Sequence, residues 1–132
     1  MRARITITLR NPLRPDLPSV EVDARVDLSC THLSVPAAIA LRLGLQKQDT
    51  RRAVVENGPE RQFAYVGPLL ASWGSRSCFA GALRHGNEIV LGTIPMDAMD
   101  LVVLPDSSEV APSPLHPNIP GSIAVGYRML AQ

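Results

Sequence analysis

A few side chains in this sequence have types and spacings that could support chemistry, and most of them lie between residues 27 and 32. Asp27 follows a stretch of alternating apolar and polar residues, and a carboxylate at such a place can act as a general acid or base. Taken alone, it has the character of an ordinary acidic residue at the end of a strand. Cys30 and His32 suggest a thiol nucleophile or, with Cys78 and His85, a metal site. Because their spacing matches no established zinc pattern, we predict that neither a metal nor another cofactor binds.

The elements that must position these side chains are mostly short strands. Val20–Val26 alternates in polarity, which predicts a half-buried strand leading directly into Asp27. Pro36–Leu43 is the one convincing helix, because proline suits a first turn and the following glycine suits a C-terminal cap. Asn57-Gly58 predicts a hairpin turn between two apolar runs, Ala53–Val55 and Gln62–Val66.

The rest of the chain also predicts mainly β structure, because twelve prolines and nine glycines interrupt it with turns. We expect further strands at Arg4–Arg10, Leu69–Trp73, Ser77–Ala80, Glu88–Gly92 and Leu101–Leu104, a hairpin at Gly74-Ser75 and a helical turn at Pro95–Met99. The apolar faces expected to form the core are those of Ile5, Val22, Val54, Leu69, Phe79, Val90 and Val102.

The composition limits the class of protein. With 132 residues, 45% of them hydrophobic and 19% charged, the chain is long enough for one domain with a modest core. The formal net charge is +1 and the arginines are spread out, so we expect neither a nucleic acid nor a membrane as partner. The N-terminal residues alternate in polarity instead of forming a signal peptide, which predicts a cytoplasmic location. Both cysteines are expected to be free thiols.

Three segments, in this order, resemble a known family. They are Val26–Pro36 (V-D-L-S-C-T-H-L-S-V-P), Val90–Val103 (apolar-apolar-glycine, a short helix and a strand) and His116–Pro120. Together they resemble the retropepsin-like (retroviral-type, clan AA) aspartic proteases, in particular the small stand-alone bacterial members. The resemblance covers roughly residues 3 to 120 and implies an all-β closed barrel of the acid protease fold. It implies a domain of residues 1–111 and a proline-rich extension, 112–132, packed on the domain or on a dimer interface.

The resemblance also implies a chemistry that needs two chains. Proteases of this type use two facing aspartates, which share one proton because carboxyl groups about 3 Å apart cannot both ionise. The chain carries one such loop, so Asp27 can form the pair only in a symmetric homodimer. Leu28, Ser29 and Cys30 would complete the loop, and the Asn57-Gly58 hairpin would be the flap that closes over an extended peptide or protein substrate.

The loop departs from the family's D-T-G pattern, because this chain has Asp27-Leu28-Ser29. Leu28 lacks the hydroxyl that ties the two loops together, and a buried polar group left unpaired costs about 1–3 kcal/mol. Ser29 adds a side chain where the family has glycine. Two functions therefore stay open: an aspartic endopeptidase, and a non-catalytic homodimer (a pseudoenzyme) that binds peptides or serves as an interaction module. Because paired carboxylates are strained, Asp27→Ala is expected to leave folding largely intact.

Overall fold

Two antiparallel strands at the N-terminus carry the segment that ends in Asp27. In the computed structural model, which describes residues 3–124, β1 (Arg4–Arg10) pairs with β2 (Val20–Val26), with Ile7 opposite Val22. The alternation in sequence becomes an alternation in burial, because every second side chain of β1 from Ile7 onward faces the interior. The strand predicted at Val20–Val26 is confirmed.

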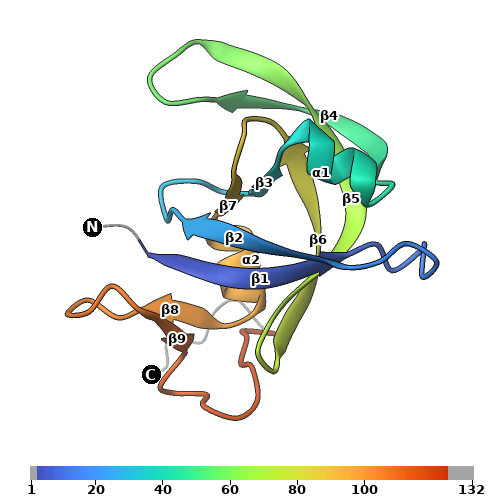
Figure 1. Ribbon diagram of the computed structural model, residues 1–132. Coiled ribbons are helices and arrows are strands. Elements are labelled where there is room, and N and C mark those ends of the chain that lie inside the picture. Colours follow the sequence, from blue (N-terminus) through green and yellow to red (C-terminus); the bar gives the residue numbers. More distant parts are fainter. Residues whose placement is uncertain (1–2, 125–132) are drawn as a thin grey trace.

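Six of the described strands form a closed barrel (Figure 1). The further elements are β3 (Leu33–Val35), α1 (Ala37–Arg42), β4 (Gln46–Val54), β5 (Glu60–Trp73), β6 (Arg76–Arg84), β7 (Ile89–Leu91), α2 (Thr93–Ala98), β8 (Leu101–Val103) and β9 (Val110–Pro112). The main sheet has the order β1-β2-β7-β3-β6-β5-β4, and β1 also pairs with β5 through Thr8–Arg10. This last pairing closes six strands into a barrel and leaves β4 outside it. The predicted all-β closed barrel is therefore confirmed.

The β4–β5 hairpin extends from the barrel as an arm, shown at the top of Figure 1. The hairpin predicted around Asn57-Gly58 is present, but β4 begins at Gln46, well before the predicted start. The prediction of two separate strands at Gln62–Val66 and Leu69–Trp73 was wrong, since one strand runs from Glu60 to Trp73. A register shift between Val66 and Leu69 lets its first half pair mainly with β4 and its second half with β6.

The core lies inside the barrel, but two of its predicted members do not. Val54 is 57% exposed and Phe79 is 72% exposed. Val54 lies on the arm, where no second layer covers it, and Phe79 points outward beside the buried Cys78. Of the other predicted members, Leu69 and Val90 are buried, and Ile5, Val22 and Val102 are half-buried. The largest buried apolar side chains are Ile7, Leu9, Leu33, Leu43, Leu69, Leu91, Met96 and Met99.

The two helices are short, and a small second sheet lies below the barrel in Figure 1. The helix predicted at Pro36–Leu43 is confirmed as α1, and Gly44 follows it with φ +63° as a left-handed cap. The second helix, α2, starts two residues before the predicted turn. Strand β9, which the sequence did not predict, pairs with β8. Within residues 3–124 no helix has both the length and the apolar character needed to cross a bilayer.

Beyond β9 the chain is held against the domain by the buried Arg76. Its guanidinium donates hydrogen bonds to the carbonyl oxygens of Met99 (3.0 Å), Asp100 (3.3 Å) and His116 (2.5 Å). The Asp100 carboxylate lies 2.8 Å from His116 Nδ1 and accepts the Gly121 N–H at 2.7 Å. These contacts attach His116 and Gly121 to the domain. The last part of the extension, residues 125–132, lies outside the described residues.

Candidate functional site

The loop that carries Asp27 begins where β2 ends and is anchored on β7. The Asp27 N–H donates to the Leu91 carbonyl oxygen at 3.0 Å, continuing the parallel pairing of β2 with β7. The Cys30 N–H then donates to the Asp27 carbonyl oxygen at 3.1 Å and closes a tight turn. The sequence positions Asp27 by ending a paired strand one residue before it.

Gly92 holds the second half of this loop in place. Its N–H donates to the His32 carbonyl oxygen (3.2 Å), and the N–H of Thr93 donates to the Cys30 carbonyl oxygen (2.9 Å). A Cβ atom on residue 92 would lie 2.6 Å from the carbonyl carbon of Thr31 and 2.6 Å from the His32 oxygen. The close approach of the two backbones therefore requires glycine directly after Leu91, the last residue of β7.

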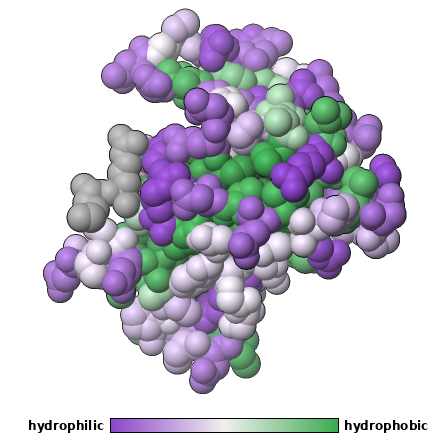
Figure 2. Space-filling view, in the orientation of Figure 1, coloured by the Kyte–Doolittle hydropathy of each residue, from purple (hydrophilic) through white to green (hydrophobic). Residues whose placement is uncertain are grey.

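A cleft of about 810 Å³ opens beside the loop. Asp27, Ser29 and Cys30 line one side of it, and the end of the β4–β5 arm, from Arg52 to Glu56, lines the other. In Figure 2 the arm overhangs a hollow at the upper left, above a group of hydrophilic side chains. Phe63, Leu83 and Val90 add apolar surface, and His85 to Glu88 form a further edge. The cleft is thus lined by both apolar and charged side chains.

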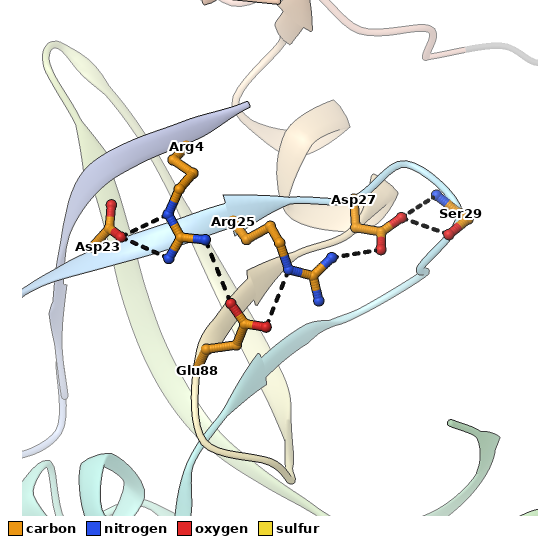
Figure 3. Close-up of polar contacts among 6 residues, drawn as sticks. All are labelled: Arg4, Asp23, Arg25, Asp27, Ser29 and Glu88. Atoms are coloured by element: carbon orange, nitrogen blue, oxygen red, sulfur yellow. Dashed lines mark hydrogen bonds and ion pairs between the residues drawn. The ribbon is translucent and has the colours of Figure 1, made fainter. Parts of the chain in front are cut away.

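The Asp27 carboxylate is held by three contacts. Oδ1 accepts the Ser29 N–H at 3.0 Å and the Ser29 hydroxyl at 2.5 Å, and Oδ2 lies 2.8 Å from Arg25 Nη1 (Figure 3). The hydrogen bonds from Ser29, followed by the Arg25 guanidinium, lower the pKa of Asp27 from 3.8 to about 2. Partial burial opposes this effect without cancelling it. Asp27 in this chain is therefore an ionised carboxylate with its own counter-ion.

Arg25 belongs to a longer row of alternating charges. Its Nε donates to Glu88 Oε2 at 3.2 Å, and Glu88 lies 3.6 Å from Arg4 Nη1. Arg4 in turn pairs with Asp23 at 2.7 Å (Figure 3). The strand register places Arg4 directly opposite Arg25, and like charges in such a pair repel each other. Glu88 reaches both arginines from the bend that precedes β7 and offsets this repulsion.

The thiol and histidine next to Asp27 do not form a nucleophile pair. Burial, and secondarily the negative charge of Asp27, raises the pKa of the Cys30 thiol, which disfavours the reactive thiolate. Burial and the charge of Arg51 lower the pKa of His32. The His32 ring packs edge-on against Tyr65, with 5.5 Å between the ring centroids. Both cysteines are free thiols. Within the described residues, no group of three or more metal-ligating side chains is placed to hold an ion.

The structure brings some of the predicted site residues together and leaves others apart. Asp27, Ser29 and Cys30 share the cleft. Leu28 points elsewhere, because its side chain is 55% exposed and lines a neighbouring cavity of about 360 Å³ with Ala3, Val103 and Ser108. Asn57 and Gly58 lie at the exposed tip of the arm, beyond the residues that line the cleft.

Three residues that line the cleft were not predicted from the sequence, namely Arg25, Glu88 and Phe63. Arg25 could have been found, because side chains two residues apart on a strand share a face and Asp27 follows it by two. Glu88 and Phe63 come from distant parts of the chain. Only the pairing of β2 with β7 and the position of the arm bring them to the cleft.

Comparison with known proteins supports the fold. No family model matches the chain, and no curated protein matches it by sequence. Among solved structures, it is similar to EIAV protease complexed with the inhibitor HBY-793, with a TM-score of 0.50 and 11% identity over 73% of this chain and 86% of that one. The fold is retropepsin-like. The retropepsin-like fold expected from the Val26–Pro36 and Val90–Val103 segments is thus confirmed, and at this identity the likeness concerns the fold alone.

Proposed function

We propose that two copies of this chain form a symmetric homodimer whose groove holds an extended peptide or protein segment. The observation that carries this proposal is the cleft between Asp27 and the β4–β5 arm in a chain of retropepsin-like fold. The cleft is open along one side and bounded by one acidic loop. A second copy, related by a two-fold axis, would add an equivalent cleft and a second Asp27. The assignment to small stand-alone bacterial retropepsins and the cytoplasmic location remain predictions.

The walls of the cleft suit a peptide in extended form. Ala53 to Val55 and Phe63, all on the arm, offer apolar surface to side chains. An arm that ends in an exposed turn at Asn57-Gly58 can close over a bound chain and present backbone groups to it. We therefore assign Asn57 and Gly58 to the flap of the dimer.

A binding experiment with a matched pair of variants tests this function. The probe is fluorescently labelled, unfolded casein, and its affinity is followed by anisotropy while light scattering gives the mass of the protein. Phe63→Ala removes an aromatic ring from the cleft, and Phe79→Ala removes one that is 72% exposed on another surface. We expect the first variant to weaken binding about tenfold and the second to leave it unchanged. Equal affinities in both variants would contradict the proposed groove.

The second candidate is an aspartic endopeptidase, and the position of Asp27 in the cleft favours it. In that reaction one ionised Asp27 activates a water as general base, and the protonated Asp27 of the other subunit polarises the scissile carbonyl. The ion pair with Arg25 and the replacement of D-T-G by Asp27-Leu28-Ser29 oppose it. For this reason binding without cleavage is the function we favour.

Cleavage can be measured directly. Unfolded casein is incubated with the protein between pH 4 and 6, with and without a statine-type inhibitor, and the products are identified by mass spectrometry. Inhibitor-sensitive cleavage that disappears in Asp27→Asn would establish the endopeptidase. Intact casein in the presence of a folded dimer would support the binding module.

A further inference from the structure

Asp27 and Arg25 form the least exposed ion pair of the row that ends in the cleft. The side chains of Arg25 and Asp27 are 16% and 28% exposed, whereas Arg4 and Asp23 at the other end are 46% and 59% exposed. Water and salt screen an exposed pair strongly and a partly buried pair much less. Of the ion pairs in this row, Arg25–Asp27 is therefore screened least, and its two charges interact most strongly.

Arg25 is also fixed in its position. Arg25 Nε lies 3.2 Å from Glu88 Oε2, and Arg25 Nη1 lies 2.8 Å from Asp27 Oδ2. The two carboxylates therefore bind different nitrogen atoms of one planar guanidinium and fix its orientation. The hydrogen bond that Arg25 donates to Asp27, followed by the negative charge of Glu88, raises the pKa of Arg25, which stays protonated. The groups around Asp27 are thus Arg25 on its own strand, Ser29 and Cys30 on its loop, and Glu88 reaching it through Arg25.

We propose that Arg25 is a positioning residue that keeps each Asp27 ionised when a second copy of the chain places another Asp27 opposite to it. In a pair without counter-ions, repulsion between the carboxylates makes them share one proton. A pair in which each carboxylate has its own guanidinium has no such need, since the two arginines offset the two negative charges. Arg25 would then account for a groove that binds a peptide without the protonated carboxyl that cleavage requires. The part of this inference that concerns the dimer rests on the proposed function.

Titration of Asp27 by NMR tests the inference. The protein is labelled with 13C at aspartate carboxyls, and the Asp27 signal is assigned by its absence in Asp27→Asn. Its midpoint is then measured in the wild type, in Arg25→Met and in Arg25→Lys, which retains the charge. Arg4→Met is the matched control, because Arg4 belongs to the same row and contacts Glu88 but not Asp27. Arg25→Gln replaces the methionine variant if that variant does not fold.

We expect the Asp27 midpoint to rise by about one pH unit in Arg25→Met, by less in Arg25→Lys, and not in Arg4→Met. The two hydrogen bonds from Ser29 remain and keep the midpoint of an isolated protomer below about 3.9. In a dimer of Arg25→Met, the Asp27 pair should titrate in two steps, because the two carboxylates share a proton. One of these steps should lie above about 3.9.

The outcomes separate the two proposals. If Asp27 in Arg25→Met titrates in a single step at a raised midpoint, the role of Arg25 is supported and the pairing of the two Asp27 loops is contradicted. Two steps in Arg25→Met, against one step near pH 2 in the wild type, support both. An unchanged midpoint in Arg25→Met, or an equal rise in Arg4→Met, overturns the role proposed for Arg25 whatever the mass of the protein.

Discussion

The contacts of Asp27 predict a stabilising charge at a position where the resemblance to proteases suggests a strained one. Its pKa falls from 3.8 to about 2 on folding. One pKa unit corresponds to about 1.4 kcal/mol, so the ionised form contributes about 2.4 kcal/mol to the free energy of unfolding at pH 7. Because the side chain is partly exposed and water screens its charge, this value is an upper bound.

The dependence on pH gives the sign of the effect. A carboxyl whose folded pKa is lowered stabilises the protein above its unfolded pKa, and this contribution is lost as the pH falls through the folded pKa. As the pH falls from the unfolded pKa of 3.8 towards the folded pKa of about 2, the contribution of Asp27 to the free energy of unfolding decreases. It should be about 1.3 kcal/mol at pH 3 and about 0.4 kcal/mol at pH 2. The stability difference between the wild type and Asp27→Asn should therefore shrink by about 1 kcal/mol between pH 7 and pH 3.

Urea unfolding of the wild type and Asp27→Asn at several pH values measures this difference. Asp23→Asn is the control, because Asp23 pairs with Arg4 on an exposed surface, where ion pairs contribute less than about 1 kcal/mol. An Asp27→Asn protein at least as stable as the wild type at pH 7 would refute the reasoning. Such a result is expected if two Asp27 side chains repel each other and share a proton.

Three further predictions concern the framework of the site. Arg76→Met leaves three carbonyl oxygens without their buried donor, so the free energy of unfolding in urea should fall by about 2–5 kcal/mol. Gly92→Ala introduces a Cβ atom 2.6 Å from loop backbone, and calorimetry should show a clearly lower Tm; an unchanged Tm would contradict the close approach of the two segments. Asp100→Ala removes the acceptor of the Gly121 N–H, so this amide should exchange with deuterium faster while amides of β5 keep their rates.

The strands that lead to the site were predictable because their burial alternates with the sequence. Val20–Val26 and the helix after Pro36 depend on local signals, namely alternation, a proline and a capping glycine. The length of β5 was not predictable, because Gly67-Pro68 has the composition of a strand end and only the register shift against its neighbours carries the strand through it. Phe79 was misplaced because an apolar residue type does not by itself say which face of a strand is covered.

The site was predictable at Asp27 and much less so around it. The loop residues are adjacent in sequence, so one motif found them together. The counter-ion of Asp27, Arg25, is bound by Glu88, which lies more than sixty residues away in the sequence. No local sequence pattern predicts such a contact. The contacts of Asp27 therefore reverse the expectation that Asp27→Ala leaves folding largely intact. A carboxylate with three partners contributes stability, so its removal is now predicted to lower it.

A cross-link at Leu28 tests the pairing of the two loops most directly. Leu28 is 55% exposed at the loop tip, and residues next to a two-fold axis meet their own copies. In a protein whose Cys30 and Cys78 are replaced by serine and alanine, Leu28→Cys should form a disulfide-linked dimer under mild oxidation, as judged by non-reducing electrophoresis. Leu41→Cys, on an 83% exposed side chain of α1, should remain monomeric on the gel. Equal cross-linking of the two variants, or none at residue 28 in a folded protein, would contradict the paired groove.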